Sequence, residues 1–432
     1  MAVTIEEKPY SFTKVGQKLI YRTTSTNVAN TGFRFVFKIY EGTTNLISTV
    51  YVVPTPEATP QGVFDLSTIV KHRIETKLEL QDNEPSVDFQ SSTYPVYLYK
   101  IVVMEGYIVS GVFTEQSGTA QTNYHYFIPC SYSHMDGYRP NPDDRYGLDG
   151  VTKLLMGDRN SGTHIPRVMP SGLTASSSRV FIPIRNTNLD GGYLYYVTDY
   201  ADALSAKDSG LSTNTYVRMK LVQSSGGNIF ATEAIGGNGI VKIPAYPKSL
   251  EGTTSLINPN DYPNFRYYSI TVTDSTGATQ LSAEYVFYPE EVDCIYDNIR
   301  VAWWSPVSGG YDYFNFSKKN EQSIEVERKR VQRVVGNYSS ASGGFGYDNA
   351  DRGLMEGNVE TRTYITMTSD YIKENEFALL KNMIRSNDVY IINDDQTILP
   401  VVIEENAYTE RRTRDGKVYN LTIRVRYSNE DL

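Results

Sequence analysis

The chain has 432 residues, 40% of them hydrophobic, and its 41 Lys and Arg against 50 Asp and Glu give a formal net charge of −9 at pH 7. This length predicts about two to four domains with cores of their own. The acidic balance argues against a general nucleic-acid-binding protein, which would usually carry a basic surface. Two cysteines, Cys130 and Cys294, are too few for a disulfide framework.

The first residues lack a basic segment followed by an apolar one, and no apolar run approaches the roughly 18 residues of a membrane span. We therefore expect a protein that is made and assembled in a cytosol. Tyrosine is the compositional outlier, with 35 copies. Its ring buries apolar area while its hydroxyl keeps a hydrogen-bond partner, which suits both β-strands and subunit interfaces, and composition does not separate these two explanations.

Residues 1–135 predict a first β-sandwich domain. Phe33–Tyr40 alternates between apolar and polar residues, a polar turn follows, and Leu46–Val53 returns, which is the pattern of a hairpin. A short helix after Asp65 and two further strands, Tyr94–Val103 and Tyr124–Pro129, complete the set.

Residues 136–178 are rich in Gly, Pro, Asp and Ser and predict a long loop or arm. Residues 179–300 then repeat the earlier order of elements, with Thr215–Val222, Gly239–Pro244, Tyr262–Val272 and Ala283–Pro289 in succession. We interpret the repeat as a diverged duplication and expect two tandem immunoglobulin-like β-sandwich domains. Chance similarity between two unrelated β domains is the alternative.

The last third of the chain changes in pattern. Residues 301–317 hold both tryptophans and predict an aromatic connector, and residues 318–432 predict a compact C-terminal α+β assembly module. In this module Ser323–Val331 reads as a long edge-type strand with charges on its exposed face, and residues 337–353 as a Gly- and Ser-rich loop. A helix from Ser369 or Asp370 to about Ile384 and two hairpins follow.

No motif of a catalytic, cofactor or metal site stands out. A phosphate-binding loop, a dinucleotide fingerprint and a nucleophile elbow are missing, and the four histidines are scattered. The acidic loop around Asp143 and Asp144 lacks the calcium-loop pattern; a solvated loop is the default there and a calcium site the alternative. We expect a protein that is not an enzyme, with no cofactor and no metal, although a pair of glycosidase carboxylates would meet only in the fold.

Two basic clusters, Arg328–Arg330 with Arg333 and Arg411–Arg412 with Arg414, are interleaved with acids. Such mixed signs favour salt-bridged edges or subunit contacts over phosphate binding. The candidate interface residues lie in the connector, where aromatic rings can pack a seam between modules, which we favour over stacking on a ligand. They are Trp303, Trp304, Gly309, Gly310, Tyr311, Tyr313, Phe314 and Phe316.

The stretch Gly309–Phe316, followed by Lys318 and Lys319, resembles a motif of virion proteins from phages that infect Bacteroidetes, including crAss-like phages. The C-terminal module is similar to tail and collar components of those phages, while the upstream repeats are similar only in style. The resemblance implies a structural virion protein in a multi-copy tail or head–tail connector (collar) ring. Such a ring would be a closed oligomer of about twelve copies with head-to-tail contacts.

The resemblance also implies the partners. They are further copies of the chain and other tail or portal-proximal proteins; DNA would pass through the assembly without specific binding, and no membrane would be involved. Two alternatives stay open. One is a receptor- or glycan-binding tail appendage, and the other is a carbohydrate-active enzyme on β-sandwich modules.

Overall fold

The computed structural model describes residues 3–9, 12–74, 76, 78, 80, 86–88, 97–129, 179–185, 189–197, 215–235, 240–274, 284–290, 296–306, 310–339, 341, 343–347, 353–373, 380–404 and 418–429. Within them the chain is built of strands with only short helical segments, so the expected mainly β class is confirmed. The expected loop or arm at 136–178 lies outside the described residues.

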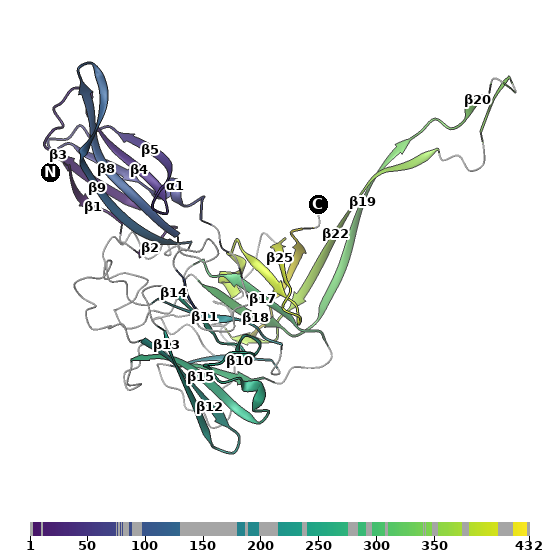
Figure 1. The fold of residues 1–432 in the computed structure, drawn as a ribbon. Coiled ribbons are helices and arrows are strands. Elements are labelled where there is room, and N and C mark those ends of the chain that lie inside the picture. The colour runs from purple at the N-terminus through teal and green to yellow at the C-terminus, as the bar shows by residue number, and fades with distance from the viewer. Residues whose placement is uncertain are drawn as a thin grey trace.

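The first sandwich, purple to blue in Figure 1, has two sheets with strand orders β1-β3-β6 and β2-β9-β8-β4-β5. Both sheets contribute to one core, in which Tyr21 of β3 packs against Phe37 of β4 with ring centroids 5.8 Å apart. Helix α1 follows Asp65, whose carboxylate accepts a hydrogen bond from the Ser67 backbone N–H at 3.0 Å. The elements are β1 (Val3–Glu7), β2 (Phe12–Lys14), β3 (Ile20–Ser25), β4 (Arg34–Glu41), β5 (Asn45–Val52), β6 (Gln61–Asp65), α1 (Ser67–Val70), β8 (Tyr97–Val109) and β9 (Val112–Ile128).

The second sandwich, teal in Figure 1, has sheets with the orders β10-β16-β15-β12-β13 and β11-β14-β7. Strand β7 (Ser86–Asp88) comes from the connection between β6 and β8 of the first sandwich, yet it pairs with β14 and so joins the second. The other elements are β10 (Arg179–Ile184), β11 (Tyr193–Val197), β12 (Thr215–Gln223), β13 (Asn228–Ile235), β14 (Ile240–Pro244), α2 (Pro247–Leu250), the 3₁₀ turn η3 (Pro259–Asp261), β15 (Phe265–Asp274) and β16 (Glu284–Pro289).

The two five-stranded sheets have the same topology. In chain order β2, β4, β5, β8 and β9 take the same places as β10, β12, β13, β15 and β16. Both sheets also begin with a parallel pair, β2 with β9 and β10 with β16, while their other pairs are antiparallel. The three-stranded sheets differ, because β1 extends the sheet beside β3 whereas β7 extends it beside β14. Matching order and direction of five strands support the duplication.

The C-terminal part forms an antiparallel seven-stranded sheet with the order β18-β17-β24-β25-β27-β22-β19. Residues 380–384 are helical, and Leu380 and Met383 are buried in the core of this sheet. Two small strand pairs, β20-β21 and β23-β26, lie outside it. The strands are β17 (Ile299–Trp304), β18 (Tyr311–Phe316), β19 (Asn320–Gln332), β20 (Asn337–Ser339), β21 (Gly344–Gly346), β22 (Leu354–Thr368), β23 (Ile372–Lys373), β24 (Val389–Ile392), β25 (Ile398–Ile403), β26 (Val418–Tyr419) and β27 (Thr422–Tyr427).

Two expectations about this part need correction. The segment 301–317 is not a separate connector, because β17 and β18 are hydrogen-bonded members of the seven-stranded sheet through the pairing of β17 with β24. The helix does not begin at Ser369 or Asp370, because Ile372 and Lys373 form strand β23 and pair with β26. Local helix-favouring residues were overridden there by a strand partner far along the chain.

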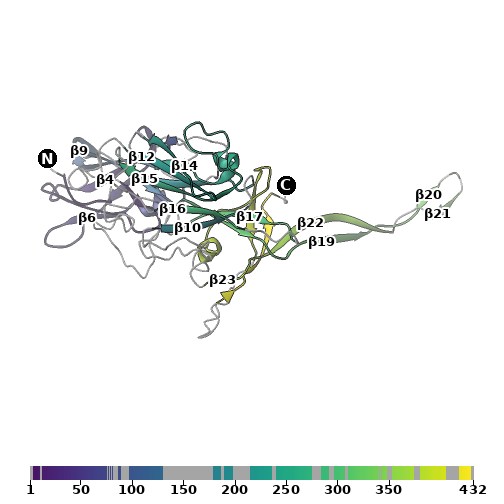
Figure 2. The ribbon, with the colours of Figure 1, turned by 90° about the horizontal axis from the view of Figure 1, so that it is seen from below.

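Strands β19 and β22 continue outward beyond the body of the sheet as a two-stranded ribbon. Figures 1 and 2 show it projecting away from the rest of the molecule in both views, with β20 and β21 at its tip. We call residues 320–368 the arm. The ladder runs from Asn320 opposite Met367 to Gln332 opposite Leu354, and the 13 residues of β19 span about 40 Å.

Candidate functional site

The hairpin β17–β18 is buried on both faces, and its two faces belong to different cores. Side chains alternate along a strand, so the neighbours Trp303 and Trp304 point to opposite sides. One face, with Ala302, Trp304, Tyr311 and Tyr313, joins the core of the second sandwich. The other, with Val301, Trp303 and Phe316, joins the core of the C-terminal sheet. The hairpin is therefore a layer that two modules share.

The structure gathers the candidate interface residues in this hairpin, apart from Gly309, which lies outside the described residues. Gly310 has φ of 84°, a left-handed conformation that glycine adopts without strain. Its carbonyl oxygen accepts a hydrogen bond from the Ser305 N–H at 2.9 Å, which closes the turn. Phe314 is half-buried, and its ring centroid lies 5.1 Å from that of Phe316.

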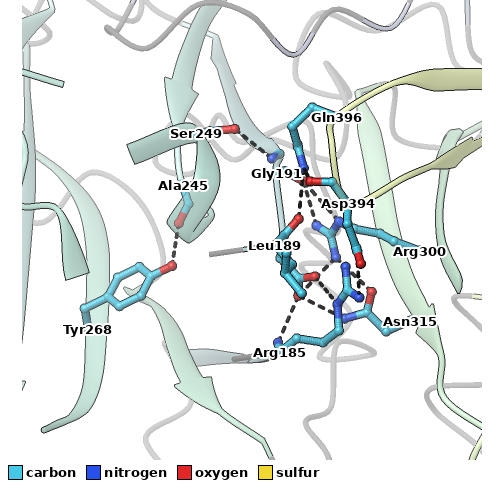
Figure 3. Close-up of polar contacts among 12 residues, drawn as sticks. Arg185, Leu189, Gly191, Ala245, Ser249, Tyr268, Arg300, Asn315, Asp394 and Gln396 are labelled. Atoms are coloured by element: carbon cyan, nitrogen blue, oxygen red, sulfur yellow. Dashed lines mark hydrogen bonds and ion pairs between the residues drawn. The ribbon is translucent and has the colours of Figure 1, made fainter. Parts of the chain in front are cut away.

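A buried cluster of charged side chains fastens the second sandwich to the hairpin (Figure 3). Asp190, between β10 and β11, is fully buried. Its Oδ1 accepts from Arg185 Nε at 2.6 Å, and its Oδ2 accepts from the Arg185 backbone N–H and from Asn315 Nδ2, both at 2.9 Å. Arg300 Nη1 lies 3.5 Å from the same Oδ2. The Asp190 carboxylate thus connects Arg185 of the second sandwich to Arg300 of β17 and Asn315 of β18.

Arg300, on β17, is buried like Asp190, and its side chain contacts residues of both modules. Its Nε and Nη2 donate to the Gly191 carbonyl at 3.1 and 2.8 Å, and its Nη1 donates to Asn315 Oδ1 at 3.2 Å. Its guanidinium carbon also lies 4.5 Å from the Tyr246 ring centroid and 4.9 Å from that of Tyr313. Aromatic faces attract a desolvated cation, so both rings stabilise the buried charge.

The charges of this cluster compensate one another. Burial by itself would raise the pKa of Asp190, but the neighbouring Arg300 and Arg185 guanidinium groups outweigh burial and lower that pKa below its ordinary value. Asp190 therefore stays ionised at neutral pH. The arrangement fixes the orientation of two modules, and we interpret it as a structural ion-pair network.

The first sandwich meets the C-terminal sheet at a smaller contact. Trp304 Nε1 donates to the Pro129 carbonyl at 2.6 Å, and the Thr76 hydroxyl donates to the Asp388 carboxylate. A cavity of 270 Å³ lies beside these bonds, with Trp304, Lys71 and Asn387 among its lining residues.

The arm is the second notable feature. Every residue of β19 after Asn320 is exposed, and the tip carries exposed aromatic rings at Tyr338, Phe345 and Tyr347. Val334 is 85% exposed. A two-stranded ribbon is marginally stable at best in water, and exposed apolar side chains along one are typical of interaction surfaces.

Sequence reasoning found the aromatic residues but missed Arg185, Asp190 and Arg300. One signal was available: Arg300 stands within the otherwise apolar run Ile299–Trp304, and a buried arginine needs an anion. Its partner Asp190 lies 110 residues earlier, however, and nothing local connects the two. The second basic cluster, Arg411 to Arg414, lies outside the described residues.

Comparisons with known proteins give no family: no protein-family model matches the chain, and no curated protein matches it. Within the described residues, no group of three or more His, Cys, Asp and Glu side chains is placed to hold a metal ion. In the same part of the chain, every helix is too short or too polar to cross a membrane.

Proposed function

We propose that this chain is a structural, non-enzymatic virion subunit of a tailed phage, which assembles with copies of itself into a closed ring of the tail or head–tail collar. The arm is the observation that carries this proposal. It projects from the body with nearly all of β19 exposed. A monomeric protein gains nothing from ordering such a ribbon, whereas a subunit can use it to enlarge a contact. The phage context itself rests on the resemblance of Gly309–Phe316 and the C-terminal module.

The proposal includes a finer description of the modules. We propose that both sandwiches are immunoglobulin-like, because β9-β8-β4 and β16-β15-β12 follow the G-F-C order of that fold, and β3 pairs with β6 as B pairs with E. The seven-stranded sheet with its helix would be the α+β assembly module. In this division the sandwiches act as spacers and the C-terminal module makes the ring contacts.

Light scattering on the purified full-length chain tests the assembly. We expect a discrete closed oligomer whose mass is a fixed multiple of the 48.7 kDa chain. A matched variant replaces residues 327–360 by Asn-Gly, which joins Val326 to its ladder partner Thr361 through a tight hairpin turn. This arm-shortened variant should be monomeric. A full-length chain that stays monomeric at all accessible concentrations would contradict the proposal.

A receptor- or glycan-binding appendage is the second candidate, and the cavity beside Trp304 favours it. Indole rings and polar side chains such as Asn387 commonly form sugar-binding sites. A glycan array probed with the full-length chain separates the two functions. Binding that is lost in both Lys71→Ala and Asn387→Ala, in a monomeric chain, would favour the appendage. An oligomer that binds no glycan would favour the ring.

A further inference from the structure

In the outer part of the arm, both long edges lack a strand partner in the described part of the chain. Strand β19 ends the seven-stranded sheet, and β22 pairs with β27 only from Tyr364 to Thr368. Over residues 354–361, β22 therefore pairs with β19 alone among the described strands. Each outer edge presents a row of backbone N–H and C=O groups, which is a template for pairing with another strand.

We propose that the arms of neighbouring copies pair edge to edge, β19 of one copy with β22 of the next, so that the arms of a ring form one closed sheet. This inference rests on the proposed function, because it names the surface through which the copies would assemble. If the copies are related by rotation about an axis parallel to the arms, all the arms point in the same direction. Because β19 and β22 are antiparallel, their outer edges then also meet antiparallel.

A second copy fits these edges better than an unrelated strand does. Each arm offers one β19 edge and one β22 edge, so every contact is head-to-tail, and a rotation that closes pairs the outer part of both edges in every copy. In such a ring the apolar face of every arm also lies on the same side of the shared sheet. Ile324, Val326 and Val359 lie on the face that continues toward the buried core residue Met367, while Glu325 and Glu327 lie on the other face.

The charges favour a particular offset between neighbouring arms. Within one arm Glu327 lies directly opposite Glu360, which is an unfavourable pair of like charges. If β22 of the next copy is offset by two residues, Glu327 faces Arg362 and Lys329 faces Glu360. An even offset keeps the apolar residues of both arms on the same face. Closure of a sheet requires such a stagger between strands.

Nucleic acid is the main competing occupant, because Arg328, Lys329, Arg330 and Arg333 lie in the outer half of the arm. Two of these basic side chains already pair with acidic side chains of the same arm: Arg328 Nη1 lies 2.6 Å from Glu356 Oε2, and Lys329 Nζ lies 3.2 Å from Glu360 Oε1. Acidic side chains interleaved with basic ones weaken phosphate binding. A second arm, which carries both signs of charge, is therefore the occupant that the charges favour.

Cysteine cross-linking between two differently substituted full-length chains tests the pairing. Lys329→Cys and Glu360→Cys are mixed in equal amounts under mild oxidation. Residues that face each other across a ladder have the Cα separation a disulfide needs, so we expect about tenfold more disulfide-linked dimer in the mixture than in either variant alone. The unmodified chain gives the background from Cys130 and Cys294. Lys329→Cys mixed with Phe230→Cys, a half-exposed position on β13, is the matched control.

Hydrogen exchange on the same samples separates failure of this inference from failure of the proposed function. Slowing of the amides of residues 327–332 and 354–361 by about tenfold or more in the oligomer, together with the cross-link, supports edge pairing. An oligomer without the cross-link, whose arm amides exchange as fast as in the dissociated chain, overturns edge pairing and leaves the ring intact. A persistent monomer overturns both. Protection that appears only with added duplex DNA assigns the arm to nucleic acid and overturns the inference.

Discussion

Asp190 holds the second sandwich to the hairpin β17–β18 through Arg185, Arg300 and Asn315. Removing one partner of a buried ion network leaves the other charges uncompensated, so Asp190→Asn should lower the free energy of unfolding by about 3–5 kcal/mol. Asp394→Asn is the matched control. Asp394 contacts the same Arg185 at 3.2 Å but is 61% exposed, so its loss should cost about 1 kcal/mol at most. Equal effects in urea unfolding would contradict this account.

The lowered pKa of Asp190 also predicts a dependence on pH. A carboxyl group whose pKa is lower in the folded than in the unfolded chain stabilises the fold fully above its ordinary pKa of about 3.9. The stabilisation is lost as the pH falls through the lowered native value. Between neutral and acid pH, wild-type stability should therefore fall more steeply than that of Asp190→Asn. Parallel curves of unfolding free energy against pH would show that Asp190 does not titrate in this way.

Gly62 of β6 occupies a place where no side chain fits. A Cβ atom there would lie 2.4 Å from the Phe35 ring and 2.7 Å from Thr23 Oγ1. Overpacking of this kind costs about 1–3 kcal/mol, so Gly62→Ala should destabilise the first sandwich by that amount. Gly118→Ala in β9 is the control, because an added Cβ there has no atom within 4 Å. Thermal unfolding that ranks the two variants in the reverse order would refute this prediction.

At the scale of single elements, the arm and the hairpin β17–β18 are opposite cases. Both are two-stranded, but β17 and β18 are buried by two cores, whereas β19 and the outer part of β22 are exposed. The fold of the monomer therefore depends on the hairpin β17–β18 and not on the outer part of the arm. The arm-shortened variant should keep the unfolding free energy of the dissociated full-length chain within about 0.5 kcal/mol. A large fall in Tm would mean that the arm packs against its own body.

At the scale of the whole molecule, the core of the first sandwich is separate from the core that the second sandwich shares with the C-terminal sheet. The core of the first sandwich contains only residues of β1 to β9 and their connections. The core of the second sandwich also contains Trp304, Tyr311, Tyr313 and Ile392 from the seven-stranded sheet. Modules that share a core unfold together, so calorimetry should show two transitions. Gly62→Ala should lower only one and Asp190→Asn only the other; a single transition moved by both variants would contradict this division.

Much of this architecture was predictable from the sequence, because it is local. Alternation in Phe33–Tyr40 and Leu46–Val53 is confirmed as the hairpin β4–β5, and the charged edge-type strand at Ser323–Val331 is confirmed within β19. The repeated order of elements, read from the sequence, corresponds to two sheets of the same topology. A period of two in the side chains is enough to find such strands, since burial on one face selects it.

What the sequence by itself determined is therefore where the strands lie and which aromatic residues they carry. Only the tertiary structure decided that β17 and β18 belong to the C-terminal sheet, and that Trp303 and Trp304 enter different cores. Only it joined Arg300 to Asp190, and only it showed that the strand at Ser323–Val331 leaves the body as an arm. The physical reason is the same in each case: strand partners and ion pairs form between residues far apart in the chain, and a local pattern specifies a side chain's need for burial or charge without specifying what meets it.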